Sequence, residues 1–245
     1  MPDDWKYGRA EDHGTLRYCL DPRDPEWEIA RDIAEAIAGA LLLKPAEYVV
    51  PDQRVTATWD TLNHHLLRNC DVYFGFKLIP GGYPEWLSVS RAYYTASYAL
   101  AVEDPAWQSL ADVPPDRPIA TAIGTSADFA LTKYIQTQPA GARWTRFPMG
   151  TNETALAALE DGTAGAALVW GPAAWAIGQA DPAYAGVRLV PIAPLPDTSL
   201  GVGAALLAKQ SFLRASVDQA IGDLQADGTI AGILAAHEFP ARAGP

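Results

Sequence analysis

Apolar runs of strand length alternate with helical patterns along the first third of the chain. The run TLRYCLD predicts a strand, and the apolar residues after it recur every three or four positions, which predicts a helix. The alternation then repeats, so we predict a parallel sheet covered by helices. The predicted strands lie at 15–21, 48–50 and 71–76, and the predicted helices at 27–41 and 60–69, the latter capped by Asp60.

The same rhythm returns after an aromatic-rich loop at residues 81–104, whose last part, 97–102, is predicted to be extended. A second module of this kind predicts a second α/β lobe. The chain then closes with one more extended segment and two helices. The predicted strands are 118–123, 143–147, 166–170, 187–192 and 199–209, and the predicted helices are 126–138 capped by Ser126, 152–160 capped by Asn152, 212–225 and 228–237.

One extended segment and two helices follow the second module. We predict that they return to the first domain, which is therefore discontinuous in sequence. We predict an α/β protein with a two-lobed fold like that of periplasmic binding proteins, in which each lobe is a mixed, mainly parallel sheet flanked by helices. Lobe 1 is assigned to residues 14–101 and 197–245, and lobe 2 to residues 102–196. Two chain crossings predict a hinge, with a cleft between the strand ends of the lobes.

The charge narrows the classes of partner. A formal net charge of −11, without a cluster of Lys and Arg, argues against nucleic acid and anionic membrane surfaces, because both are polyanions. Basic or neutral partners remain. No apolar run approaches the roughly 20 residues of a membrane span, and the first residues show no signal-peptide pattern.

Motifs that carry catalysis or bind metals are not found. The chain has no G-x-S-x-G, H-E-x-x-H or P-loop motif and no G-x-G-x-x-G after a strand. The four histidines are not spaced to complete a metal site with two cysteines. We therefore predict a protein that is not an enzyme, with no cofactor and no metal. Cys19 and Cys70 form either a disulfide or two buried thiols.

Two groups of residues could contact a ligand or a partner. Gly124, Thr125 and Ser126 open a helix after a strand, where backbone N–H groups and hydroxyls favour an anionic or carbonyl oxygen; an ordinary helix cap is the alternative interpretation. Aromatic residues near predicted strand ends and loops supply flat contact surfaces. They are Tyr83, Trp86, Tyr93, Tyr94 and Trp170, together with Tyr98 and Trp175, which we expect in the core, and Lys77 and Arg91 are the cations nearby.

From Thr15 to Pro240 the chain resembles the periplasmic solute-binding proteins of family 3, the polar amino-acid type, with a type II fold. The resemblance rests on LRYCLDP, CDVYFGF, SRAYYTASYALAV, AIGTSADFAL and ALEDGTAGAALVWGP, in that order. Amino-acid receptors of that family hold the ligand with an arginine after the third strand and an aspartate in the second lobe. Here the expected Thr-x-x-Arg pattern is missing after Phe76, and Trp170 stands at the aspartate position. Because burying an unpaired ammonium or carboxylate is costly, an amino-acid ligand is disfavoured.

Within that family the chain is similar to the J-type accessory proteins encoded beside PQQ-dependent methanol dehydrogenases. The short RDPEWEIA after Asp21-Pro22 departs from the glycine-bearing loop of that group. The similarity implies a periplasmic protein, its signal peptide absent from this sequence, that assists a quinoprotein methanol dehydrogenase. The alternative partners are the permease of an ABC importer and a small organic ligand that is not an amino acid. The matching positions are Cys19, Cys70, Gly82-Tyr83, Arg91-Ala92-Tyr93-Tyr94 and Val169–Pro172.

The same resemblance bears on the cysteines and on the site. An extracytoplasmic location favours a Cys19–Cys70 disulfide. If the first and third strands are adjacent and parallel without stagger, the two residues lie ~10 Å apart, so we expect the bond to require a register offset. The residues expected to bind a ligand or partner are Asp21, Trp27, Phe76, Tyr83, Trp86, Arg91, Tyr94, Gly124, Thr125, Ser126 and Trp170.

Overall fold

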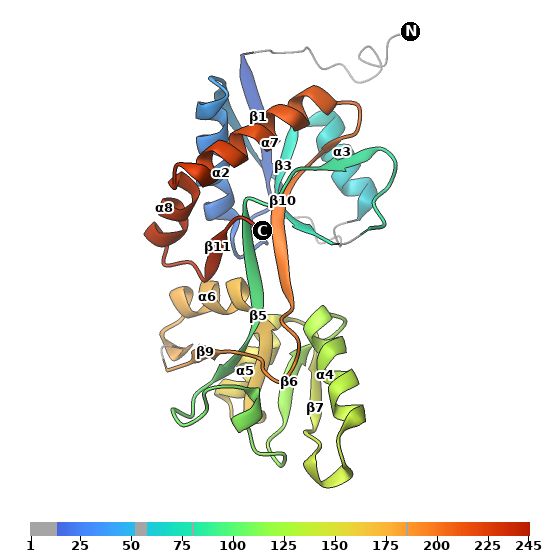
Figure 1. The fold of residues 1–245 in the computed structure, drawn as a ribbon, viewed down its shortest axis with the longest axis vertical. Helices are drawn as coiled ribbons and strands as arrows, with labels where there is room; N and C mark the ends of the chain where they lie inside the picture. The colour runs from blue at the N-terminus through green and yellow to red at the C-terminus, as the bar shows by residue number, and fades with distance from the viewer. Residues whose placement is uncertain (1–13, 52–57, 80, 185) are drawn as a thin grey trace. The chain divides into compact units, whose positions relative to one another are not determined.

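The computed structural model describes residues 14–51, 58–79, 81–184 and 186–245. The chain folds into two compact units, one made of the chain up to Thr95 together with Leu200–Pro245, the other of Ala96–Ser199. The chain leaves the first unit within β5 (Tyr94–Val102) and returns to it at the start of β10 (Ser199–Leu207) (Figure 1). Within each unit the strands pair in a sheet, and each unit has its own buried apolar clusters.

The sheet of the first unit has the strand order β2-β1-β3-β10. Its first three strands run parallel and β10 runs antiparallel to β3, while the short β4 pairs with Ala205–Leu207 along the other edge of β10. Helices cover both faces of this sheet. Alternate residues of β1 point to opposite faces, so they contact different helices. Tyr18 reaches Glu35 of α2, whereas Cys19 packs beside Leu66 of α3. The elements are β1 (Thr15–Leu20), α2 (Trp27–Ala40), β2 (Lys44–Val49), α3 (Trp59–Arg68), β3 (Val72–Leu78), β4 (Leu87–Val89), α7 (Ser211–Ala226), α8 (Thr229–Ala236) and β11 (Ala241–Ala243).

The sheet of the second unit has the order β5-β8-β6-β7, with β9 paired to β5. The strands β8, β6 and β7 are parallel, and β5 is antiparallel to β8. Leu131 of α4 packs with Leu168 on one face, and Leu156 of α5 packs with Val169 on the other. The elements are β6 (Ile119–Ala122), α4 (Ser126–Thr137), β7 (Arg146–Met149), α5 (Asn152–Glu160), β8 (Ala166–Trp170), α6 (Gly171–Ala180) and β9 (Arg188–Val190), with 3₁₀ turns at Leu110–Asp112, Ala140–Ala142 and Pro182–Tyr184.

The α/β fold class is confirmed, and the predicted strands and helices occur in the predicted order. The prediction lacked β4, α6 and β11, and three predicted helix caps are wrong. The helices α3, α4 and α5 are capped by Thr58, Thr125 and Thr151, whose hydroxyls accept a hydrogen bond from the backbone N–H three residues on. Asp60, Ser126 and Asn152 lie inside the first turn instead. The pattern misplaced the caps because the helices begin one or two residues earlier than the apolar periodicity indicates. No described helix has both the length and the apolar character needed to cross a membrane.

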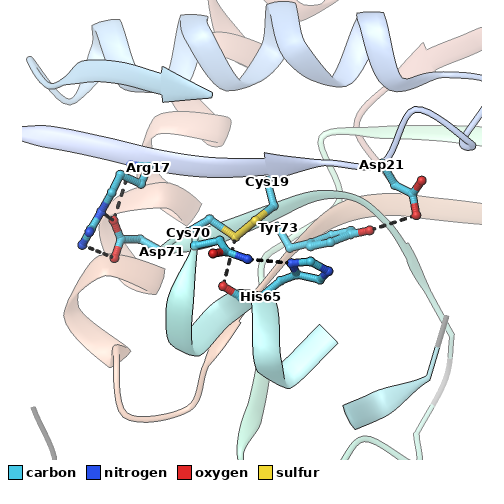
Figure 2. The surroundings of a disulfide bond; sticks show 8 residues. Arg17, Cys19, Asp21, His65, Cys70, Asp71 and Tyr73 are labelled. Atoms are coloured by element: carbon cyan, nitrogen blue, oxygen red, sulfur yellow. Dashed lines mark hydrogen bonds and ion pairs between the residues drawn. A yellow bond between two sulfur atoms is a disulfide. The ribbon is translucent and has the colours of Figure 1, made fainter. Parts of the chain in front are cut away.

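The cysteines form a disulfide, with their Cα atoms 5.5 Å apart (Figure 2). The expected register offset is wrong, because Cys19 pairs with Tyr73 in the sheet, so Cys70 lies three positions back. The bond forms because Cys70 belongs to the connection between α3 and β3, where its N–H and its sulfur both lie near the carbonyl of His65. That turn brings Cys70 under the face of β1. Burial lowers the pKa of the neighbouring His65, whose Nδ1 contacts Asn69 Nδ2 at 2.9 Å.

Candidate functional site

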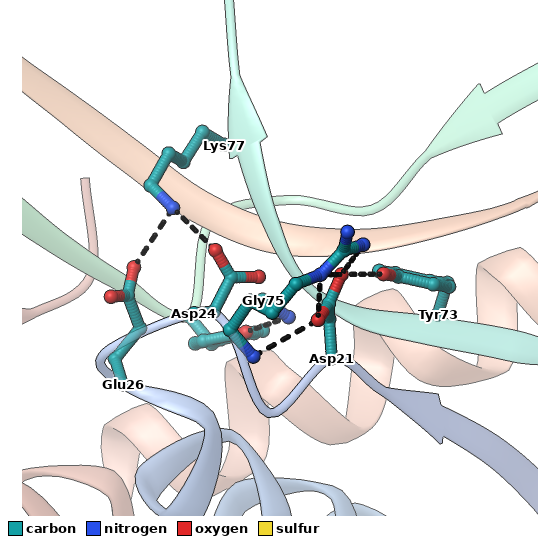
Figure 3. A network of polar contacts seen from close by, with 8 residues as sticks. Asp21, Asp24, Glu26, Tyr73, Gly75 and Lys77 are labelled. Atoms are coloured by element: carbon teal, nitrogen blue, oxygen red, sulfur yellow. Dashed lines mark hydrogen bonds and ion pairs between the residues drawn. The ribbon is translucent and has the colours of Figure 1, made fainter. Parts of the chain in front are cut away.

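Polar side chains gather where β1 and β3 end in the first unit (Figure 3). Asp21 follows β1 and is buried, with an exposed fraction of 7%. The Arg23 guanidinium donates to both of its carboxylate oxygens, at 2.6 and 2.9 Å, and the Tyr73 hydroxyl donates at 3.3 Å. Burial alone would raise the pKa of Asp21, but these hydrogen bonds outweigh it and hold the pKa below its usual value. Asp21 is therefore a carboxylate whose charge is already balanced.

A second ion-pair group lies beside the first. The Lys77 ammonium is 3.1 Å from Asp24 Oδ1 and 3.2 Å from Glu26 Oε1, and Glu26 is fully buried. Burial raises the pKa of both carboxyls, and Lys77 only partly opposes it. Burial by itself would lower the pKa of Lys77, yet the two carboxylates outweigh it and the net shift is upward. The chain's own ammonium thus occupies the acidic pocket.

Backbone and tyrosine groups close the back of this network. Gly75 has a φ of +78°, and its N–H donates to the Tyr93 hydroxyl at 2.8 Å. A Cβ at Gly75 would lie 3.3 Å from Asp24 Oδ2, so the residue also permits a close approach. Tyr94 is fully buried and contacts Tyr93 and Phe239 edge to face. Tyr94, which we predicted as a contact residue, therefore lies inside the core of the first unit.

The structure brings three of the predicted aromatic residues together. Phe76, Tyr83 and Trp86 are half-buried and pack on the apolar cluster that contains the disulfide. Trp59 joins them, with its ring 6.4 Å from both Phe76 and Tyr83 and an exposed fraction of 41%. Trp59 was not among the predicted contact residues, although an aromatic residue at the start of a predicted helix is a signal that marks it. We call these four residues the aromatic cluster.

The side chains of Trp27 and Arg91 contact other residues than these groups. The guanidinium of Arg31 stacks on Trp27, 4.3 Å from the ring centroid. The guanidinium of Arg91 packs against Gly222 of α7, since a Cβ there would come within 2.7 Å of it. The Arg91 backbone N–H donates to Asp218 of the same helix. Arg91 therefore contacts α7, and we find Lys77 alone of the two predicted cations in the polar network.

In the second unit, two of the predicted residues, Gly124 and Thr125, contact a buried aspartate, Asp128, that was not predicted. Asp128 accepts hydrogen bonds from the Thr121 hydroxyl at 2.6 Å, the Gly124 N–H at 3.0 Å and the Arg146 guanidinium at 2.6 and 2.8 Å. Burial would raise the pKa of Asp128, but these donors, Arg146 first, hold it below its usual value. The Gly124 N–H therefore already donates to the Asp128 carboxylate, and the Thr125 hydroxyl caps α4 by accepting from the Asp128 N–H. No sequence signal we considered marked Asp128 or Arg146, because their partners come from three separate elements.

Trp170 ends β8, and its exposed fraction is 4%. Its ring lies edge to face on Tyr98, with centroids 5.1 Å apart, and its backbone N–H donates to Asn152. The indole Nε1 is enclosed without a hydrogen-bond partner among the described residues. Tyr98 packs against the core as predicted, and Trp175 is half-buried. The position where the resemblance implies an aspartate is therefore filled by an aromatic pair.

These contacts limit what the described residues can bind. The acidic groups near the ends of β1 and in the first turn of α4 are paired with cations of the same chain: Asp21 with Arg23, Asp24 and Glu26 with Lys77, and Asp128 with Arg146. Within the described part of the chain, three or more His, Cys, Asp or Glu residues never come together as a metal site would require. A zwitterionic ligand would have to displace these internal pairs, which carries a desolvation cost of several kcal/mol.

Solved structures share this fold at low sequence identity. The second substrate-binding domain of a putative amino acid ABC transporter from Streptococcus pneumoniae matches with a TM-score of 0.70 and 16% identity, over 91% of this chain and 99% of that one. Substrate-binding domain 2 of Lactococcus lactis GlnP, in an open conformation, matches with a TM-score of 0.71 and 15% identity, over 93% and 97%. An ancestral amino acid-binding protein, a precursor of cyclohexadienyl dehydratase, matches with a TM-score of 0.60 and 21% identity, over 96% and 97%.

No protein-family model matches the chain, and no curated protein matches it. At these identities the likeness to solved structures establishes the fold. The chain has the type II fold of periplasmic binding proteins, as found in the amino-acid-binding domains of ABC transporters.

Proposed function

We propose that the protein is an extracytoplasmic accessory protein with a solute-binding fold, acting on a partner protein instead of delivering an amino acid to an importer. The observation that carries the proposal is the internal pairing of the strand-end charges. Lys77 occupies the pocket of Asp24 and Glu26, and Arg23 covers Asp21. An amino acid would need a free cation for its carboxylate and a free anion for its ammonium.

The partner we propose is a PQQ-dependent methanol dehydrogenase, which the protein would bind or help to mature. The sequence resemblance to the J-type accessory proteins supports this choice, and the net charge of −11 suits a basic partner. The Cys19–Cys70 disulfide supports a location outside the cytoplasm, because such bonds persist in oxidising compartments.

A second candidate is a receptor for an importer that takes a small, mostly apolar or monoanionic organic molecule. The aromatic cluster favours it, because flat rings with one enclosed hydroxyl suit an organic ligand. The Tyr83 hydroxyl is enclosed and has no hydrogen-bond partner among the described residues. The partner would then be an ABC permease.

Calorimetry with the purified cognate dehydrogenase tests the first proposal, and a thermal-shift screen of amino acids and small organic molecules tests the second. We expect the dehydrogenase to bind and the amino acids to leave the melting temperature unchanged. A ligand at 100 times its Kd adds ~2.7 kcal/mol of stability, so a true solute would be evident.

Three results would overturn the accessory role. The first is an amino acid that stabilises the protein. The second is a small organic ligand that stabilises it while the dehydrogenase does not bind, which would favour the receptor. The third is a dehydrogenase that neither binds nor changes its PQQ content when the chain is deleted from its host.

A further inference from the structure

Leu42, at the end of α2, combines two unfavourable features. The helix closes with a Schellman motif, in which the Leu43 N–H donates to Ala38 and the Leu42 N–H donates to Gly39. The motif puts Leu42 at a φ of +57°, a position that usually holds glycine. Its side chain is also 93% exposed. Neither the strained backbone nor the exposed apolar surface benefits the isolated chain.

A second exposed apolar residue lies on the helix beside it. Phe212, in the first turn of α7, is 86% exposed. It precedes Ala215 and Ser216 by three and four residues, so it shares their face of α7. That face and the end of α2, including Leu41, line a shallow groove of about 370 Å³ that continues along Gln219 to Asp223. The two helices are in contact in the first unit.

The groove changes character along its length. Leu41 lines the apolar end. The exposed Leu42 follows it directly in the chain, and the exposed Phe212 lies one turn before Ala215 on α7. Asp223, whose carboxylate accepts from Gln219 Nε2, makes the other end acidic. No Lys or Arg is among the residues that line it. From Phe212 to Asp223 the helix rises ~16 Å at about 1.5 Å per residue.

We propose that this groove, lined by Leu41, Ala215, Gln219 and Asp223, docks a segment of a partner protein together with the adjoining exposed Leu42 and Phe212. The segment carries an apolar side chain at one end and a Lys or Arg about three helical turns away. Charge complementarity selects this occupant: the groove ends in a carboxylate, and the chain's net charge of −11 opposes a second copy of itself. The proposal rests on the accessory role only for the identity of the partner.

Three variants and one control test the groove with the full chain. Leu42→Gly should raise the melting temperature by about 2–4 °C, because glycine relieves the positive φ, and yet weaken partner binding. Phe212→Ser should leave the melting temperature unchanged and weaken binding about tenfold or more. Asp223→Asn should weaken binding and reduce its dependence on salt. The matched control is Phe129→Ser, which removes a side chain 64% exposed on α4 and should change nothing.

The dehydrogenase of the proposed function is the first probe, measured by calorimetry. If it binds and the groove variants weaken binding, the groove is supported. If it binds all variants equally, the groove proposal is overturned and the accessory role stands. A gain in stability without a loss of binding in Leu42→Gly would also count against the groove.

If the dehydrogenase does not bind, the accessory role fails and a second probe decides on the groove. The probe is a fluorescently labelled helical peptide with leucines at one end and two lysines three turns away, compared with a peptide carrying glutamates instead. Stronger binding of the lysine peptide, lost in Phe212→Ser, supports the groove. Equal binding of the two peptides overturns it, as does a dimer in sedimentation that Leu42→Gly dissolves.

Discussion

Lys77 is the residue that most restricts what the first unit can bind. Its ammonium lies between a fully buried carboxylate, Glu26, and the 30%-exposed side chain of Asp24. The other oxygen of Glu26 has no hydrogen-bond partner among the described residues. The two carboxylates therefore depend on one ammonium for compensation, and removing that ammonium leaves the buried negative charge of Glu26 uncompensated.

Replacing Lys77 by methionine is expected to lower the free energy of unfolding by about 2–4 kcal/mol at pH 7. The pKa of Glu26 is already raised by burial, and it rises further once the ammonium is gone. A carboxyl whose folded pKa is raised contributes stability below its unfolded pKa and loses it as pH rises. The deficit should thus be small near pH 4 and grow toward pH 8, as urea denaturation at several pH values would show.

Two further variants make this result interpretable. Lys209→Met removes an exposed lysine and should leave the stability nearly unchanged at every pH. Adding Glu26→Gln to Lys77→Met should restore part of the lost stability, because the buried negative charge is removed with its partner. A pH-independent deficit that Glu26→Gln does not reduce would show that Lys77 acts through packing.

At the scale of elements, the loop from β6 into α4 shows why residue type alone assigns the wrong role. Thr125, Ser126 and Asp128 all favour helix starts, so the sequence cannot tell which one caps the helix and which one is buried. The structure assigns the cap to Thr125, whose hydroxyl accepts from the Asp128 N–H and donates to the Ala122 carbonyl. Asp128 instead binds Thr121 of β6 and Arg146 of β7.

Thr125→Ala is therefore expected to lower the free energy of unfolding by about 1–2 kcal/mol, while Ser126→Ala changes it by less than about 0.5 kcal/mol. Both residues start the same helix, so each variant is the control for the other. Urea unfolding curves measured under identical conditions give the comparison. Equal losses in the two variants would mean that the cap bond of Thr125 adds nothing to stability.

At the scale of the whole molecule, hydrophobic periodicity sufficed to predict the two α/β modules and the order of most of their elements, but not β4, α6 and β11. It could predict them because each strand and helix has a local pattern that its own burial requires. The ion pairs could not be predicted in the same way. Glu26 and Lys77 are 51 positions apart in the sequence and meet only because β1 and β3 are neighbours. The Cys70 turn was missed for a related reason, since strand spacing was applied to a residue outside the strand.

The disulfide links only elements of the first unit, so its loss should lower the stability of that unit. It closes a loop with a sequence separation of 51 residues between β1 and the start of β3, and loops of that length give about 2–4 kcal/mol of stabilisation. We expect the paired Cys19→Ala and Cys70→Ala variant to lose amide-exchange protection in β1 and β3 while β6 and β8 keep theirs. The control is the wild-type protein under reducing conditions, because it lacks the disulfide bond but keeps both sulfur atoms. If protection falls equally in both units, the two units unfold as one cooperative body and the disulfide stabilises the whole chain.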